Sequence, residues 1–388
     1  MSDPSAVHFP CPQCGAPEMA WNAAARQMHC PYCQHQMAIP APAAQAPVAA
    51  GPNAGAAAAQ APVDPHHERT LAEGFEIIRS QAGSGLGTQV RTIACRTCGA
   101  TVSFAGVAIA STCDFCGSDQ VLEQESKRSL IRPQSLVPFG VEQERARQKF
   151  KTWLAGLWFR PNNLKHKAAV GEINGVYVPY WTFDASVASQ WTAEAGYYYY
   201  VTVSYTTQEN GRSVQRTRQE RRTRWEHASG WRNDAYDDVL VVASRGLPTK
   251  LAEKLKTFDT RELVSYDPRY LAGWRAEEYA VELDEGWSNG KAKMERGQYQ
   301  KCGGDVPGDT QRGLRVQNQF SSETFKHILM PIWIASYRYE DKPYRFLVNG
   351  QTGEVTGEAP WSWIKITLFT LLMIAIAGGI GYLFYMNR

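Results

Sequence analysis

The pattern of hydrophobic and polar positions changes most sharply near the end of the chain. Residues 366–386 read ITLFTLLMIAIAGGIGYLFYM, a run of 21 positions without a charge. As a helix this run is about 31 Å long, which matches the hydrocarbon core of a bilayer. Tryptophans precede it and tyrosines lie near its end, as in the aromatic belts of membrane proteins. We therefore predict a transmembrane helix over residues 364–386, in preference to a buried core helix.

Residues 127–360 carry shorter hydrophobic patterns, some with the spacing of a helix and some with that of a strand. Apolar positions recur at helical spacing in residues 140–157, which predicts a helix packed on a sheet or lying on a membrane surface. Runs rich in aromatic and β-branched residues predict strands over much of the remainder. Further helical pieces are expected at 250–256 and 275–283, and the polar, Gly-rich stretch that follows, up to Asp309, carries no predicted element. The expected fold class is α+β with a mostly antiparallel sheet.

Two of the predicted strands form a hairpin with an arginine-rich face. Asn210-Gly211 is a strong turn signal between them. Because strand residues alternate between faces, one face carries Arg212, Arg216, Arg218, Arg222 and Arg224. The set is open to three interpretations: a solvated edge strand, a surface for anionic lipid headgroups, or one for nucleic-acid phosphate. The nearby transmembrane helix favours lipid over nucleic acid.

Eight of the nine cysteines fall into four C-x-x-C pairs. The first two pairs are Cys11, Cys14, Cys30 and Cys33, and the last two are Cys95, Cys98, Cys113 and Cys116. Four thiolates at this spacing are typical of zinc ribbons, so we predict two Zn²⁺ ions. A redox C-x-x-C and an iron–sulfur site are the alternatives, but no motif opens a helix in a βαβ pattern. Cys302 stands alone and is expected to be a free thiol without a role.

Composition divides the chain into five parts. Residues 1–40 form the first ribbon, and residues 41–65 are an Ala/Pro-rich linker too poor in large side chains to fold. Residues 66–126 hold the second ribbon with a lead-in, residues 127–360 the α+β domain and residues 364–386 the membrane helix. A disordered linker of this length makes the first ribbon a mobile head.

Charge and cysteine usage bear on partners and location. The net charge is only +3, but residues 127–232 hold 17 Lys and Arg against 8 Asp and Glu, whereas residues 1–126 hold 5 against 10. Free thiolates require a reducing compartment, and no secretory signal is visible at the start. We expect a single-pass protein of the cytoplasmic (inner) membrane with its N-terminal bulk in the cytoplasm.

Signatures of catalysis are missing from the sequence. It contains no Walker A motif, no H-E-x-x-H, no G-x-S-x-G and no kinase set. Asp237-Asp238 and Asp284-Glu285 are carboxylate pairs, but neighbours in a strand face opposite ways. We expect no enzymatic activity and identify no small-molecule substrate.

Several strings resemble a family of bacterial membrane proteins with TFIIB-type zinc ribbons, often labelled primosomal protein N′ or helicase-like. These strings are CRTCGA and CDFCGS (within 95–118), LVPFGV (136–141), GVYVPYWTFD (175–184), DDVLVVAS (237–244) and MPIWIASYRYEDKPYRFLVNGQTGEV (330–355). The resemblance implies a zinc-binding, membrane-associated protein and a companion of SPFH-domain proteins in membrane stress. The helicase label does not suit this chain, which has no P-loop to bind ATP.

These observations leave three hypotheses. The leading one is a non-catalytic, membrane-anchored adaptor or scaffold whose zinc ribbons and cytoplasmic domain bind protein partners, an SPFH-domain membrane protein among them. The second is a nucleic-acid-binding zinc-ribbon protein that is not a helicase. The acidic first 126 residues and the charge of −2 on each Zn–Cys₄ site oppose it. The third is an enzyme of unrecognised class.

Overall fold

The computed structural model describes residues 9–39, 64–80, 85–86, 91–104, 113–125, 130–164, 169–170, 173–209, 212–255, 258–340 and 342–387. Nearly all of the predicted linker and the predicted Asn210-Gly211 turn lie outside these ranges. Within them the fold class is the expected one: α+β, with two small Cys₄ units and one apolar C-terminal helix.

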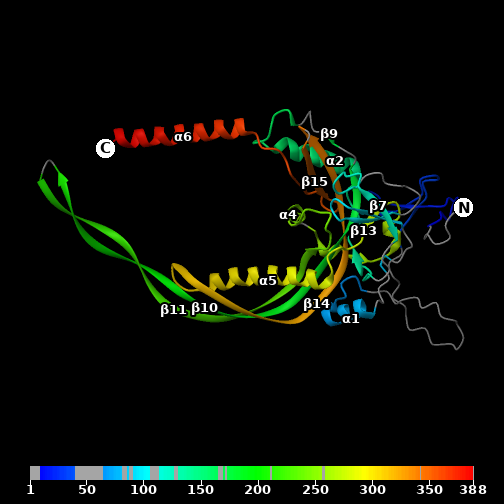
Figure 1. Cartoon of the computed structure of the whole chain (residues 1–388), viewed down its shortest axis with the longest axis horizontal. Coiled ribbons are helices and arrows are strands. Elements are labelled where there is room, and N and C mark those ends of the chain that lie inside the picture. The colour runs from blue at the N-terminus through cyan, green and yellow to red at the C-terminus, as the bar shows by residue number, and fades with distance from the viewer. Residues whose placement is uncertain are drawn as a thin grey trace.

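Three long strands form the backbone of the molecule: β10 (Asn174–Glu209), β11 (Arg212–Val242) and β14 (Thr310–Tyr339). Central β10 pairs antiparallel with β11 along one edge and with β14 along the other. The register with β14 ends at Gly196, opposite Thr310. Beyond that point β10 and β11 continue as a two-stranded ribbon of residues 197–209 and 212–224, here called the β ribbon, which projects from the body (Figure 1).

Shorter strands extend this sheet at the opposite end, where the body of the molecule lies. Both faces of β10 are buried there: Val176 and Val178 pack on one side and Tyr177 on the other. This double burial accounts for the continuous apolar runs in the sequence. The added strands are β4 (Arg69–Thr70), β5 (Arg91–Cys95), β6 (Thr101–Phe104), β7 (Val121–Glu125), β8 (Ser135–Leu136), β9 (Ala169–Val170), β12 (Val264–Ser265), β13 (Arg275–Glu277), β15 (Lys342–Asn349) and β16 (Val355–Gly357).

Five α-helices lie within the described residues: α1 (Leu71–Ser80), α2 (Gln143–Gly156), α4 (Thr249–Ala252), α5 (Leu283–Asp305) and α6 (Trp363–Met386). Short 3₁₀ turns occupy η1 (Thr260–Glu262) and η2 (Pro268–Leu271). Helix α2 confirms the amphipathic pattern in residues 140–157, and it buries Phe150 and Leu154 against the body. The expected helix at 275–283 is wrong, because residues 275–277 form strand β13.

Helix α5 occupies the polar, Gly-rich stretch for which no element was predicted. Glycine lowers helix propensity, so this composition argues against a helix on its own. In the fold the glycines bring the helix close to the sheet: a Cβ at Gly286 would lie 2.7 Å from Trp181, and one at Gly290 would lie 2.7 Å from Phe183. Close packing on aromatic side chains therefore stabilises a helix that local propensity disfavours.

The first cysteine unit does not behave as the predicted mobile head. It has a three-stranded sheet of its own: β1 (Ala20–Asn22), β2 (Gln27–His29) and β3 (Gln36–Met37). Its Trp21 is 6% exposed and belongs to the same hydrophobic cluster as Phe139 of the body. The composition of the linker carried no information about this contact, which joins residues more than a hundred positions apart.

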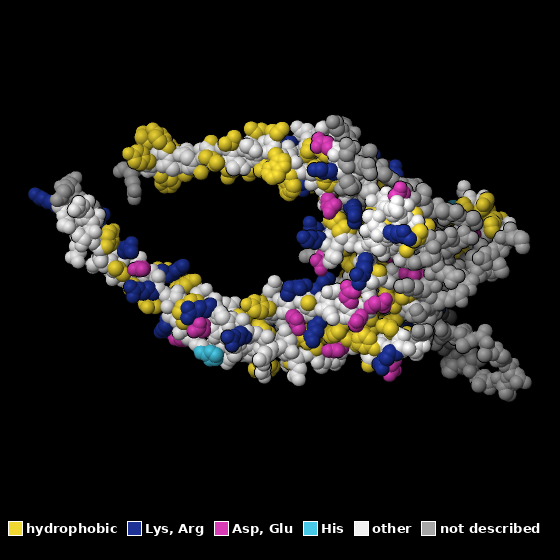
Figure 2. All heavy atoms as spheres, viewed as in Figure 1, with side chains coloured by type: hydrophobic (Ala, Val, Ile, Leu, Met, Phe, Trp, Pro, Cys, Tyr) yellow, Lys and Arg dark blue, Asp and Glu magenta, His cyan; other side chains and the backbone are white. Residues whose placement is uncertain are grey.

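Helix α6 leaves the same side of the body as the β ribbon, and the two projections border an open hollow (Figures 1 and 2). None of its residues is buried. It is the one helix among the described residues that is long and apolar enough to cross a membrane. Its N-cap is Ser362, which stands just before the tryptophan-flanked apolar run.

Candidate metal centres and the arginine face

The eight paired cysteines converge in two clusters of four. In each cluster the four Sγ atoms all lie within 4.8 Å of one another. Cys11 and Cys33 Sγ are 3.6 Å apart, and Cys95 and Cys116 Sγ are also 3.6 Å apart. A disulfide needs about 2.05 Å, whereas four sulfurs bound tetrahedrally at about 2.3 Å from Zn²⁺ lie about 3.8 Å apart. The geometry therefore fits a metal ion in each cluster.

A tight backbone turn holds each C-x-x-C pair. In the second cluster the Gly99 N–H donates to the Cys95 carbonyl at 2.9 Å, and Gly117 does the same to Cys113 at 2.8 Å. Both glycines have positive φ, a conformation that glycine adopts without strain. In the first cluster Gly15 closes one turn, but Gln34 closes the other at φ 61°. A non-glycine residue in this conformation costs about 1–2 kcal/mol.

The second cluster is built into the main sheet. Strand β6 pairs with β13, which pairs in turn with β10, and β5 continues the sheet from β6. Phe115, between the two cysteines of its turn, is 1% exposed and packs in the core with Val176 of β10. Asp114 accepts hydrogen bonds from Asn174 and Arg275. The loops that carry the thiols are therefore part of the core of the body.

The first cluster is attached by side-chain docking. The Trp21 backbone N–H donates to the Ala272 carbonyl at 3.0 Å, and the Trp274 indole N–H donates to the Trp21 carbonyl at 3.0 Å. The ring of Trp21 meets Tyr270 edge-on at 4.7 Å. Within the described part of this unit, residues 9–39, no strand joins the large sheet. Cys14 is exposed, whereas none of the second cluster's cysteines is.

The thiols of one cluster cannot all ionise easily without a cation. Burial raises the pKa of Cys95, but the backbone N–H groups of Cys98 and Thr97 outweigh it and the pKa falls to about 7. The hydrogen bond with Cys98 and burial together raise the pKa of Cys113 above its usual range. Four neighbouring thiolates repel one another. A bound divalent cation offsets this repulsion and keeps the coordinated thiols deprotonated. Four convergent thiols thus suit a metal ion as ligands.

The five predicted arginines lie on one face of the β ribbon and all are exposed. The register places tyrosines opposite three of them: Tyr197 faces Arg224, Tyr199 faces Arg222 and Tyr205 faces Arg216. The Arg224 guanidinium lies 5.7 Å from the Tyr197 ring and 2.9 Å from a Glu226 oxygen. This face is therefore a mixed arginine and tyrosine surface that nothing else in the described chain covers.

A charge cluster around the buried Lys326 was not predicted from the sequence. Lys326, 3% exposed at its side chain, pairs with Glu68 at 3.0 Å and with Asp238 at 2.9 Å. Asp184 and Asp237 offer carboxylate oxygens within 4.8 Å of Glu68. Burial and the nearby Glu68 raise the pKa of Asp184 to about 7. The cluster joins β10, β11 and β14 to the segment before α1. The ammonium group of Lys326 lies among the carboxylates and offsets their negative charge.

The expectation that Asp237 and Asp238 face apart is wrong at this point. The pairing of β10 with β11 shifts register between Phe183 and Ala185, and Asp238 has φ 51°. This irregularity turns both carboxylates toward the same cluster. The available signal was a lysine and an aspartate inside otherwise apolar strands, at Lys326 and Asp184.

Comparison with known proteins gives one curated relative. The chain is 27% identical over 252 residues to "Uncharacterized protein YdjG" of Bacillus subtilis (strain 168), covering 64% of this chain and 69% of YdjG. No family model matches the chain. No solved structure matches it either. The resemblance to TFIIB-type zinc-ribbon proteins therefore stays a prediction.

Proposed function

We propose that the chain is a non-catalytic, zinc-binding adaptor anchored in the cytoplasmic membrane by α6, with its bulk in the cytoplasm. The anchor is supported by a helix of 24 residues that buries none of them within the chain. Zinc is supported by two sets of four converging thiols. The cytoplasmic side is supported by the same thiols, which need a reducing compartment to stay unpaired.

The proposed adaptor role is supported mainly by the exposed β ribbon. A two-stranded ribbon is marginally stable alone and leaves both outer edges with free backbone N–H and C=O groups. Its residues, 197–209 and 212–224, hold six Arg against two Glu, a net charge of +4. Free strand edges, tyrosines and positive charge suit a partner that adds a strand and presents acidic side chains. We propose an SPFH-domain membrane protein as that partner, as the family resemblance implies, in a membrane-stress response.

Site-specific crosslinking in intact cells tests this proposal. A photoreactive residue at Val203, on the arginine and tyrosine face, should yield a discrete adduct with one protein. The same residue at Tyr299, which is 52% exposed on α5, is the matched control and should yield none. Deletion of residues 363–386 should abolish the Val203 adduct, because the proposed partner is a membrane protein and the chain binds it only when it is anchored in the same membrane. An adduct pattern identical at both positions would remove the adaptor role.

Nucleic-acid binding is a second candidate, favoured by the mixed arginine and tyrosine face. Arginines neutralise phosphates and tyrosines stack on bases, so single strands are the suitable ligand. A filter-binding titration of the full chain in detergent decides between the two. Binding through five arginines would give a log–log salt slope of about −3.5. A flat salt dependence would remove this candidate and leave the protein partner.

A further inference from the structure

The base of α6 is held firmly by the loop that follows α2. The Ser362 N–H donates to the Phe159 carbonyl at 2.9 Å. About two turns further along the helix, Phe369 meets the ring of Phe159 edge-on at 5.3 Å. The Lys365 Nζ donates to the Trp158 carbonyl at 2.9 Å. These contacts join residues about 200 positions apart, so the start of α6 and the loop form one structural unit.

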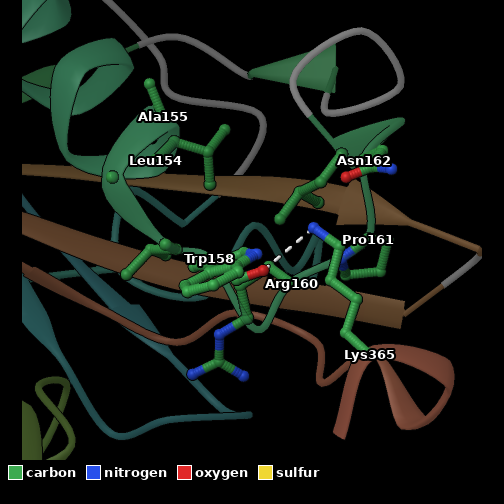
Figure 3. Close-up of a pocket in the computed structure, with 10 residues that line it drawn as sticks. Leu154, Ala155, Trp158, Arg160, Pro161, Asn162 and Lys365 are labelled. Carbon is green, nitrogen blue, oxygen red and sulfur yellow. Dashed lines mark hydrogen bonds between the residues drawn. The ribbon is translucent and has the colours of Figure 1, made fainter. Parts of the chain in front are cut away.

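Two cavities open at this base, and Arg160 lines both of them. The first has a volume of about 450 Å³ and is lined by the end of α2, the following loop and Lys365 (Figure 3). Figure 3 shows Lys365 reaching from α6 to the loop beside Pro161. The second cavity, of about 570 Å³, lies between Arg160, α4 and the segment before α6, and Lys250 and Lys254 line it. Both volumes fall in the range of small-ligand sites.

The cations of these cavities lack matching carboxylates. Among the described residues, no carboxylate oxygen lies within 4 Å of Arg160, Lys365, Lys250 or Lys254. Arg160 instead stacks 3.7 Å over the Trp361 ring and donates to the Ala359 carbonyl. Glu358 lines the second cavity and is its one acidic residue. The net charge of the lining residues is therefore positive, which suits an anion.

Exposed tryptophans place these cations at a defined depth in a membrane. Trp158 is 73% exposed, Trp361 58% and Trp363 75%, and all three surround the start of α6. Tryptophan prefers the boundary between headgroups and hydrocarbon. With α6 spanning the bilayer, Arg160 and Lys365 stand at the level of the phospholipid phosphates. Anions at that depth are lipid headgroups at high local concentration.

We propose that the base of α6 is a binding site for the phosphate of an anionic glycerophospholipid, with Arg160 and Lys365 as its principal ligands and Lys250 and Lys254 at its rim. The proposal rests on α6 being a membrane anchor. The proposed lipid contact is thus at the base of α6 and not on the arginine face of the β ribbon. One lipid of the leaflet that α6 enters fills the site, and its acyl chains run along the helix.

Native mass spectrometry of the full chain in a zwitterionic detergent tests the site. Phosphatidylglycerol and phosphatidylcholine are supplied in equal amounts. The unmodified chain should retain phosphatidylglycerol about tenfold better, because phosphatidylcholine has the same phosphate but also carries a trimethylammonium cation, which the cations of the site repel. Arg160→Gln with Lys365→Gln should lose this preference. Arg218→Gln with Arg222→Gln removes the same charge from the β ribbon and should leave it unchanged.

Several results of these experiments would overturn the proposed lipid site. Equal retention of both lipids by the unmodified chain, or loss of the preference in the ribbon variant alone, would overturn it. Soluble glycerol phosphate at the concentration of the lipid should not displace the lipid, and displacement would show a site for small phosphates instead. If the double variant fails to fold, as judged by circular dichroism, Lys365→Gln alone should still weaken retention about threefold, and unchanged retention by it would overturn the proposal.

Failure of the site and failure of the anchor give different results. The anchor is tested by alkaline carbonate extraction of cell membranes. The double variant at the base should stay in the membrane pellet, because the apolar length of α6 holds it there. Release of the unmodified chain would refute the anchor, whereas an anchored chain without lipid preference would refute the site alone.

Discussion

The two cysteine clusters have the same four ligands and the same sulfur geometry, yet they are joined to the molecule in different ways. The second cluster shares strands with the main sheet, through β6 and β13. The first is a separate three-stranded unit that docks on the body through Trp21. If each cluster holds zinc as proposed, metal coordination stabilises the local fold in both cases. The attachment determines how much of the remaining structure depends on the metal. The large sheet should depend on the second cluster but not on the first.

The largest effect is expected from breaking the second cluster. Cys113→Ser removes one ligand, and structural zinc binds with about 10–16 kcal/mol, which exceeds or equals the stability of a typical domain. Because β5, β6 and the Phe115 loop belong to the core of the body, we expect loss of its cooperative unfolding transition. Thermal melting by circular dichroism measures this. Cys302→Ser, a buried cysteine outside both clusters, is the control and should keep the transition. A normal melt for Cys113→Ser would contradict the account.

Metal removal should distinguish the clusters by rate. Each cluster has two buried cysteines, but Cys14 of the first is exposed, whereas the other two cysteines of the second are half-buried. A chelator should therefore release one zinc ion quickly from the first cluster and the second ion much more slowly. A colorimetric zinc indicator follows both phases in the full chain. Cys30→Ser should remove only the fast phase, and loss of the slow phase in this variant would reverse the assignment.

The docking contact of the first cluster can be broken without touching its ligands. Trp21→Ala removes the ring that packs beside Phe139 and Tyr270, at a cost of about 3–5 kcal/mol. We expect the first unit to detach and to be cut readily by protease, with two zinc ions still bound. Limited proteolysis with metal analysis of the products tests this. Equal resistance of variant and parent would show that the docking is not held by Trp21.

The smallest expected effect concerns the turn closed by Gln34. Glycine adopts φ 61° without strain, so Gln34→Gly should stabilise the first cluster by up to about 1 kcal/mol. The fast zinc-release phase should slow accordingly. The reciprocal Gly99→Gln, at φ 79° in the second cluster, should destabilise by a similar amount or more. Faster zinc release from Gln34→Gly would show that the glutamine side chain contributes more than the turn costs.

The parts of this molecule that were predictable from sequence are those whose cause is local. Four C-x-x-C pairs and an uncharged run of 21 residues each indicate their structure without reference to the rest of the chain. The amphipathic stripe of α2 belongs to the same class. Because cysteine spacing reports only on the ligands, it predicted the two clusters but not the difference between them.

The parts that were missed depend on distant partners. Helix α5 forms because Gly286 and Gly290 fit under Trp181 and Phe183, a hundred positions away. Trp21 gave no sign of meeting Ala272 and Trp274. The charge cluster around Lys326 needs a register shift between β10 and β11 that alternation alone excludes. The cavities at the base of α6 likewise join the loop after α2 to a helix about 200 positions later.

Hydrogen exchange of Cys30→Ser, compared with the unmodified full chain in detergent, tests the difference between the clusters most directly. We predict one zinc ion per chain, rapid exchange confined to residues 9–39, and unchanged protection along β10, β11, β13 and β14. Rapid exchange throughout the large sheet would contradict this prediction, since the first cluster would then be as much a part of the core as the second.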